Sequence, residues 1–480
     1  MKKQLLLCAM SVVVFLASCS KDTDDGDINP PPPAGNTVEV SGDIASNTTW
    51  SADKIYLLKG NVFVTGNSTL TIEPGTIIKG DKATKGALVI TRGAKIMAVG
   101  TVDKPIVFTS SIAAGARKEG DWGGVILLGK AKNNLGTSVP IEGISDASDK
   151  GKHGGDDDAD NSGTMKYVRI EFAGIALSPD NEINGLTFGS VGSGTTIDYI
   201  EVYRSGDDAY EWFGGTVNCS HLLAIDTWDD DFDTDNGFSG KVQFGLAQRL
   251  SVTADVSGSN GFESDNNAAG DNTTPQTSAV FSNMTILGPV ASGNGSSVSV
   301  NANFQHGAQI RRNSAISIFN SVFVGFPEGI FYDDGLPAGG TANSSANLVA
   351  GRSVFANNLV YNSNSKSNQI KASNATALGV ITPLLAPANV FDPAAEAKSV
   401  ITDPYKYSAD LVAAARVGTP DFTVVANSPA ASGAVFTNAK LTSGFTSVAY
   451  KGAFGTENWA AGWAHFDPQS LPYTTPGAVK

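Results

Sequence analysis

Three acidic stretches, each with an aromatic residue in the same place, contain the residues of this sequence best suited to chemistry. They align at offsets of 22 and 30 residues: AYEWFGG from Ala209, DFDTDNG from Asp231 and GFESDNN from Gly261. In each stretch an acid directly follows the aromatic residue, so that the acids Glu211, Asp233 and Glu263 fall in register. Like charges this close repel each other, so such a row needs hydrogen-bond donors, open water or a cation.

Carboxylates at alternate positions of the second stretch predict a Ca²⁺ site. Its core has the form D-x-D-x-D, with the hard oxygen ligands that Ca²⁺ takes: Asp231, Asp233 and Asp235. The pattern departs from an EF-hand loop, because its glycine comes one place late and Val242 stands at the twelfth position. A second acidic run, in the loop KHGGDDDADNSG, supplies Asp156, Asp158 and Asp160. Solvated turns of an acidic secreted protein explain both runs equally well.

Other acids and two tryptophans near these stretches are candidates for binding a ligand. The set is Asp207, Asp208, Glu211, Trp212, Trp228, Asp229, Asp230, Glu263 and Asp265. A tryptophan exposed beside carboxylates would face a sugar, whereas a buried one would belong to the core. The sequence leaves both alternatives open.

The elements that must position these residues are short strands in repeats. LTIEPGTII (70–78) matches LVITRGAKI (88–96) at an offset of 18, with alternating apolar residues before a turn glycine. FSNMTILGP from Phe281 matches FNSVFVGFP from Phe319 at an offset of 38, and FANNLVY follows from Phe355 after 36 more. Coils of this length predict an all-β fold, a right-handed parallel β-helix. A β-propeller is the competing fold, but it needs four strands per blade and a steadier period.

Stacked coils leave open edges at both ends of a solenoid, and these edges must be capped. We expect the β-helix over residues 37–365 and its C-terminal end with a capping region over 366–480. In that region Trp459 and Trp463 are predicted to cover an apolar end surface, with a sugar-stacking platform as the alternative.

The N-terminus predicts export and a lipid anchor. A basic head and a short apolar run end in LASC, so residues 1–18 are expected to be a signal peptide. Cys19 would then become the acylated first residue of the mature chain, carrying fatty acids such as palmitate. Residues 19–36 form an acidic, proline-rich stretch that is expected to be a disordered tether. Cys219 is the only thiol left in the body, which excludes an intramolecular disulfide.

Catalysis by the acids is a weaker prediction. Paired carboxylates fit the outline of glycoside hydrolysis, and His306, Arg311 and Arg312 lie in a nearby basic segment. The ordered motifs of polygalacturonases and the basic residue arrangement of pectate lyases, both β-helical, are not found. No catalytic residue is therefore predicted, and the chain is expected to be a binding protein more than an enzyme.

Several longer segments resemble one family. DNSGTMKYVRIEFAG, EINGLTFGSVGSGTTIDYIEV, SGDDAYEWFGGTVN and DDDFDTDNGFSGKVQFGLAQR are similar to segments of bacterial, largely Bacteroidetes, cell-surface lipoproteins with β-helical repeats. The resemblance covers roughly residues 37 to 465. It implies a β-helix on the outer face of the outer membrane and supplies no catalytic residue.

The expected function is therefore that of a surface-anchored binding module. Its acidic edge would bind Ca²⁺ together with a glycan or an outer-membrane β-barrel protein. A net charge of −14 argues against nucleic acid as a partner. A polysaccharide lyase or glycoside hydrolase, and an accessory subunit of an outer-membrane transport or assembly complex, are the alternatives.

Overall fold

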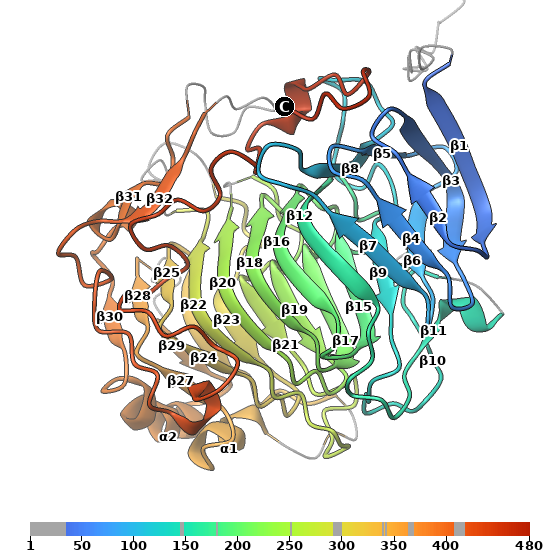
Figure 1. Cartoon of the computed structure of the whole chain (residues 1–480). Coiled ribbons are helices and arrows are strands. Elements are labelled where there is room, and N and C mark those ends of the chain that lie inside the picture. Colours follow the sequence, from blue (N-terminus) through green and yellow to red (C-terminus); the bar gives the residue numbers. More distant parts are fainter. Residues whose placement is uncertain are drawn as a thin grey trace, which may run out of the picture.

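The chain winds into a solenoid of stacked coils, and each coil passes through three parallel sheets (Figure 1). The computed structural model describes residues 35–144, 148–178, 181–249, 252–290, 300–337, 340, 343–362, 369–407 and 418–480. The predicted right-handed parallel β-helix is confirmed. The expected signal peptide, Cys19 and nearly all of the expected tether lie outside the described residues.

The three sheets run along the whole solenoid, and in several coils one long strand bends from sheet 3 into sheet 1. Sheet 1 contains β1 (Thr37–Ile44), β3 (Ile55–Val64), β5 (Ile77–Gly80), β8 (Ile106–Ser110), β12 (Gly163–Glu171), β16 (Thr196–Tyr203), β18 (Asn218–Ile225), β20 (Lys241–Gln248), β22 (Val280–Leu287), β25 (Val322–Val324), β28 (Leu359–Tyr361) and β30 (Val390–Asp392). Sheet 2 contains the second halves of β1 and β3, then β6 (Ala87–Ile90), β9 (Val125–Leu128), β15 (Leu186–Val191), β17 (Tyr210–Gly215), β19 (Phe232–Asp235), β21 (Phe262–Ser264), β23 (His306–Ile310), β26 (Glu328–Tyr332) and β29 (Ile370–Ala372). Sheet 3 contains β2 (Thr48–Trp50), β4 (Thr69–Ile72), β7 (Lys95–Val99), the first halves of β12, β16, β18, β20 and β22, then β24 (Ser317–Phe319) and β27 (Val354–Ala356).

The remaining elements lie in loops and in the C-terminal region. The loops carry β10 (Val139–Pro140), η1 (Asp149–Gly151), β11 (Lys152–His153), β13 (Ala176–Ser178), β14 (Asn181–Glu182) and α1 (Ser344–Val349). The C-terminal region carries α2 (Ala375–Leu385), η3 (Ala397–Ser399), β31 (Ile401–Asp403), β32 (Asp421–Val424), η4 (Ala439–Leu441) and η5 (Pro468–Ser470). Helix α2 places Ile381 and Leu385 in the interior cluster at the last coils. None of the helices within the described residues is both long and apolar enough to cross a membrane.

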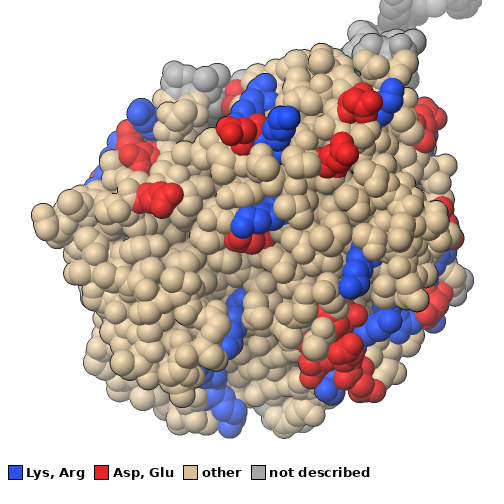
Figure 2. Space-filling view, viewed as in Figure 1, with Lys and Arg blue, Asp and Glu red and all other residues tan. Residues whose placement is uncertain are grey.

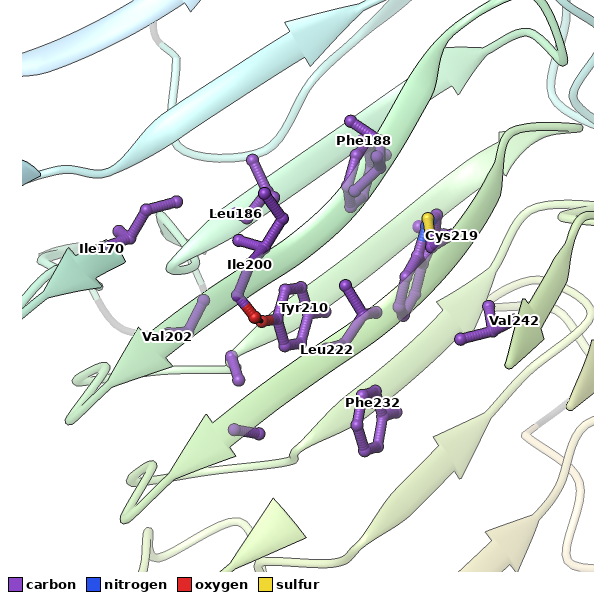
Figure 3. Packing of buried hydrophobic residues seen from close by; sticks show 14 of the residues in the cluster. Ile170, Leu186, Phe188, Ile200, Val202, Tyr210, Cys219, Leu222, Phe232 and Val242 are labelled. Atoms are coloured by element: carbon purple, nitrogen blue, oxygen red, sulfur yellow. Dashed lines mark hydrogen bonds between the residues drawn. The ribbon is translucent and has the colours of Figure 1, made fainter. Parts of the chain in front are cut away.

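The solenoid interior is filled by apolar side chains that stack from coil to coil. Tyr210, Phe232 and Phe262 are fully buried in register, with ring centroids 5.7 and 5.2 Å apart. Figure 3 shows the first two pointing into the same interior as Ile200 and Leu222 of the facing strands. The alignment of the three acidic stretches is therefore confirmed as the register of sheet 2.

The bend between sheets 3 and 1 is made by one residue in the left-handed conformation in each of seven successive coils. These residues are Tyr167, Tyr199, His221, Phe244, Asn283, Asn320 and Asn357, with φ between 51° and 63°. Asparagine tolerates this conformation, whereas an aromatic side chain adopts it at a cost in free energy. The aromatic members stack on one another at 4.5, 4.1 and 5.1 Å, which offsets that cost.

Two repeat offsets in the sequence differ from the observed stacking. The 18-residue match relates two faces of the solenoid, because Leu70 pairs with Ile96 in sheet 3 while Leu88 pairs with Val62 in sheet 2. Each face repeats the same strand and glycine turn, so faces resemble each other as closely as coils do. The later coils are spaced by 37 residues, since Phe281 pairs with Ile318 and Ile318 with Phe355. The predicted offsets of 38 and 36 each miss this register by one residue.

Residues 418–480, which we term the C-terminal strap, run back along the outside of sheet 1 toward the first coils (Figure 1). Trp459 and Trp463 pack edge-on against Tyr199, six ångströms between ring centroids in both cases. The prediction that they cover the end of the solenoid is wrong: they cover its side. The strap is needed there because sheet 1 exposes apolar residues outward as well as inward, Leu223 and Leu246 among them.

The strap also closes buried ion pairs of the early coils. Arg169 and Glu171 are fully buried, 3.3 Å apart, and Tyr473 of the strap bonds to both. The backbone N–H of His465 donates to the buried Glu201 carboxylate at 3.0 Å. Without the strap these charged groups would lose partners that a buried charge requires.

Replacing Trp463 with alanine tests the contribution of the strap. The side chain is 1% exposed, so its loss should lower the free energy of unfolding by about 3–5 kcal/mol, the usual cost of removing a buried tryptophan. Urea denaturation followed by circular dichroism measures the change. Leu135→Ala, at a side chain 54% exposed, is the control. Equal effects of the two substitutions would show that the strap does not stabilise the solenoid.

Candidate functional site

A crowded set of acids lies on the outer face of sheet 2, and we term it the carboxylate row. It comprises Asp208, Glu211, Asp230, Asp233, Asp235, Glu263 and Asp265. Side chains alternate along a strand, so burying the aromatic ladder turns the residue after each ring to the outside. Glu211 pairs with Asp233, and Asp233 with Glu263, on neighbouring strands about 4.8 Å apart. The opposite side of the molecule differs, because most acids in Figure 2 lie beside Lys or Arg.

Carboxylate oxygens of the row approach one another closely enough to share an ion. Three groups of acids each bring one oxygen per residue within 4.8 Å of the others: Asp207 with Asp208 and Asp229, Asp208 with Glu211 and Asp233, and Asp230 with Asp233 and Glu263. Asp208 and Asp233 each belong to two of these groups. The groups therefore form one continuous acidic surface.

Burial and mutual repulsion raise the pKa of these carboxyl groups. For Asp233 burial is the main cause, followed by the charges of Asp265 and Asp235, and the pKa lies well above its ordinary range. The same combination raises the pKa of Asp229 to about 6 and that of Asp235 to about 8. Full ionisation of the row at neutral pH is therefore unfavourable without a counter-charge.

Backbone and amide donors satisfy only part of the row. Asp208 accepts from the N–H of Asp230 at 2.8 Å, and Asp230 accepts from the N–H of Asn260 at 2.5 Å. By contrast, Oδ1 of Asp233 and Oδ1 of Asp229 are buried and have no hydrogen-bond partner among the described residues. An orphaned carboxylate oxygen is costly, so these atoms need a proton or a cation.

One end of the row is neutralised by arginines that the sequence placed only in a basic segment. Arg311 forms ion pairs with Glu263 and with Asp265, the latter at 2.8 Å, and Arg312 contacts Asp265 at 2.7 Å. Burial disfavours the charge of Arg311, but the adjacent Glu263 and Asp265 prevail and raise its pKa further. Arg311 therefore stays protonated. Arg311 directly follows the last residue of β23, which places it beside the end of β21 and its acids.

His306 joins a separate polar cluster at the start of β23. It begins β23, is 1% exposed, and its Nε2 lies 2.8 Å from the carboxylate of Glu328. Lys371 contacts the same carboxylate at 2.6 Å. The ion pairs lower the pKa of Glu328 to about 2 despite its partial burial. Glu328 and Lys371 lie 22 and 65 residues beyond His306, too far for a sequence motif to link them.

The predicted D-x-D-x-D ligand set is divided by the fold. Asp233 and Asp235 belong to the carboxylate row, but Asp231 is fully buried in the bend before β19 and forms an ion pair of 2.9 Å with Arg249. Alternation places residues on one face only within a strand, and Asp231 precedes the strand. Asp231 is therefore not available to the row.

The second predicted set does not form a cluster either. Asp158 pairs with Lys132 at 2.8 Å, and Asp160 is buried with Ser162 Oγ 3.3 Å away. Within the part of the chain that the structure describes, Asp156, Asp158 and Asp160 form no group whose oxygens could share an ion. Asp158 and Asp160 therefore have separate partners, and Asp156 is exposed.

The two candidate tryptophans have different environments. Trp212 is fully buried and stacks on Phe188 and Phe238 at 5.4 and 5.3 Å, so its prediction as a ligand-binding residue is wrong. Trp228 is 40% exposed and lines a pocket of about 220 Å³ together with Asp207 and Asp229. We term this cavity the Trp228 pocket. It adjoins the carboxylate row through the group formed by Asp207, Asp208 and Asp229.

Substituting Asp233 with asparagine tests the repulsion in the row. A raised native pKa means that the metal-free protein loses stability as pH rises through that pKa, so the neutral variant should be more stable than wild type at pH 8. Each unit of raised pKa corresponds to about 1.4 kcal/mol. At pH 4, where the wild-type group is protonated, the difference should vanish. Thermal unfolding in EDTA at both pH values measures it.

Asp156→Asn, at an exposed acid, is the matched control and should change little at either pH. A lower melting temperature for Asp233→Asn at pH 8 would show that the Asp233 carboxylate stabilises the metal-free fold, contrary to the repulsion inferred here.

One of three comparisons with known proteins, the match to a family model, agrees with the architecture. No curated protein matches the chain. Among solved structures, the Dettilon tailspike protein matches over 72% of this chain with 11% identity and a TM-score of 0.28, and the chain spans 63% of the tailspike chain's length. A family model described as a pectate-lyase-like β-helix domain matches residues 42–386. The chain thus belongs to the family of pectate-lyase-like β-helix domains.

Proposed function

We propose that this β-helix is a binding module whose carboxylate row holds Ca²⁺ and presents it to a glycan. The observation that carries the proposal is Asp233, which belongs to two groups of three acids while its Oδ1 is buried without a hydrogen-bond partner in the described part of the chain. A divalent cation beside this oxygen would remove both the orphaned acceptor and the repulsion. The row supplies only hard oxygen atoms, the donors that Ca²⁺ takes in sets of 6–8.

The residues that would hold the cation are Asp208, Glu211, Asp230, Asp233 and Glu263. Calcium usually completes its coordination with water or with oxygen atoms of a ligand, and sugar hydroxyl and carboxyl groups are suitable donors. Trp228, exposed beside the row, offers an apolar ring for a sugar. This residue supports a glycan as the partner of the row.

The proposal includes display on the cell surface. Its support is the sequence around Cys19, with the signal-like run before it and the acidic, proline-rich stretch behind it. A lipid on Cys19 would hold the solenoid at the outer membrane with its row free to meet extracellular polysaccharide.

Glycan cleavage is a second candidate, favoured by the family and by carboxyl groups that titrate near neutrality. Asp229 and Asp235, with pKa values of about 6 and 8, could donate protons. Arg311 is unsuited to proton abstraction, because its ion pairs with Glu263 and Asp265 keep it charged. Binding therefore accounts for more of the site than cleavage does.

Calcium should stabilise the protein through the row. At free calcium 100-fold above the dissociation constant, a site specific to the folded state contributes about 2.7 kcal/mol, which raises the melting temperature. Asp233→Asn should lose this increment, because it removes the shared carboxylate. Thermal unfolding with calcium and with EDTA measures both.

Asp156→Asn is the control and should keep the full calcium response. If calcium raises the melting temperatures of wild type and Asp233→Asn equally, the row is not the site.

Incubation with acidic polysaccharides separates binding from cleavage. A binding module should retain the polymer in affinity electrophoresis only when calcium is present, with no unsaturated products at 235 nm and no new reducing ends. Release of either product, lost in Asp229→Asn or Asp235→Asn protein, would replace the binding proposal with the enzymatic one.

A further inference from the structure

We propose that the Trp228 pocket binds the protonated amine of an amino sugar. The inference rests on the proposed glycan-binding role and names the sugar class that this part of the surface recognises. The pocket has a volume of about 220 Å³, below the range of roughly 300–1,000 Å³ that takes drug-sized molecules. It therefore suits one small group at the end or side of a longer chain.

The lining of the pocket selects for positive charge. It includes the carboxylates of Glu182, Asp207, Asp229 and Asp255, and no Lys or Arg is among the described residues that line it. Four acids around so small a space create a negative potential that a cation relieves and an anion increases. A uronate or sulfate group would be repelled here.

Hydrogen bonding inside the pocket leaves one acceptor without a donor among the described residues, because Oδ2 of Asp255 also accepts from the backbone N–H of Ser257 at 2.8 Å. Ser257 Oγ lies 2.7 Å from Oδ2 of Asp229 and 2.7 Å from Oδ2 of Asp255. A hydroxyl group has a single proton and can donate to only one of them. Oδ1 of Asp229 is also buried without a partner among the described residues. An N–H donor entering the pocket would supply this missing partner.

The indole of Trp228 distinguishes an organic cation from a metal ion. Its side chain is 40% exposed at the pocket, where an ammonium group gains cation–π attraction from the ring face. A metal ion would use the carboxylates and make no use of the indole. An amino sugar meets all three requirements, since it carries three N–H donors, a positive charge and an apolar ring face.

Calorimetric titration with a trimer of glucosamine tests the proposal, with the N-acetylated trimer as the neutral comparison. The titrations are made at pH 6 in EDTA, so their outcome does not depend on calcium in the carboxylate row. Wild type should bind the free amine at least tenfold more tightly than the acetylated trimer. Asp255→Asn and Trp228→Ala should each weaken amine binding at least tenfold, and added salt should weaken it further.

Asp103→Asn is the control, at a side chain 93% exposed on the far coils, and should bind as wild type does. Melting temperatures confirm that each variant is folded. Equal affinity for the two trimers, or full affinity in both pocket variants, would overturn the proposal. The proposal would also be overturned if calcium displaced the amine and bound to Trp228→Ala protein as tightly as to wild type. The pocket would then be a site for inorganic cations. If the protein binds the amine but calcium does not change its stability, the proposal of calcium in the carboxylate row is refuted. The proposal of amine binding in the Trp228 pocket is then still supported.

Discussion

The stacking of parallel coils about 4.8 Å apart is the constraint on which this molecule depends. In-register stacking places each residue beneath its counterpart in the next coil. Residues of the same kind at matching positions therefore form a column along the solenoid. Inside, the column of Tyr210, Phe232 and Phe262 gains dispersion and excludes water. Outside, the adjacent column of Glu211, Asp233 and Glu263 accumulates repulsion. The stable core and the strained acidic surface therefore have the same geometric cause.

A solenoid with an apolar outer face on sheet 1 needs a second layer, and the C-terminal strap provides it. Trp459 and Trp463 cover stacked rings at the bend, while Tyr473 reaches the buried charges of the first coils. These contacts join residues some 260 to 310 positions apart, so the strap forms them only after the coils exist. The outer face of sheet 2 is covered over the early coils by loops, whose Ile141, Ile144 and Ile183 pack near Val89 and Ile126.

The sequence was sufficient for features that depend on local pattern. Alternation and turn glycines predicted the β-helix, and the aromatic residues of the acidic stretches fixed the register of three coils. The sequence predicted the wrong stacking where two faces of the solenoid have similar sequences, as for Leu70 and Leu88. It also predicted the wrong side-chain position for Asp231, which lies just outside a strand. Alternation could have placed Trp212 in the interior, because it lies two residues after Tyr210 of the aromatic ladder on the same strand. The strap was missed because its partners are distant.

The carboxylate row differs from several buried acids elsewhere in the molecule, which form ion pairs. Three acids buried elsewhere in the molecule each form an ion pair with an arginine: Asp231 with Arg249, Asp226 with Arg204, and Glu171 with Arg169. Among the described residues no Lys or Arg forms an ion pair with Asp208, Glu211, Asp230 or Asp233. These four acids have no ion-pair partner among the described residues, although the charge of Arg311 acts on Asp233, and they form a cluster that an external cation can complete. Arg311 and Arg312 mark where that cluster ends, because beyond them the fold again supplies its own positive charge.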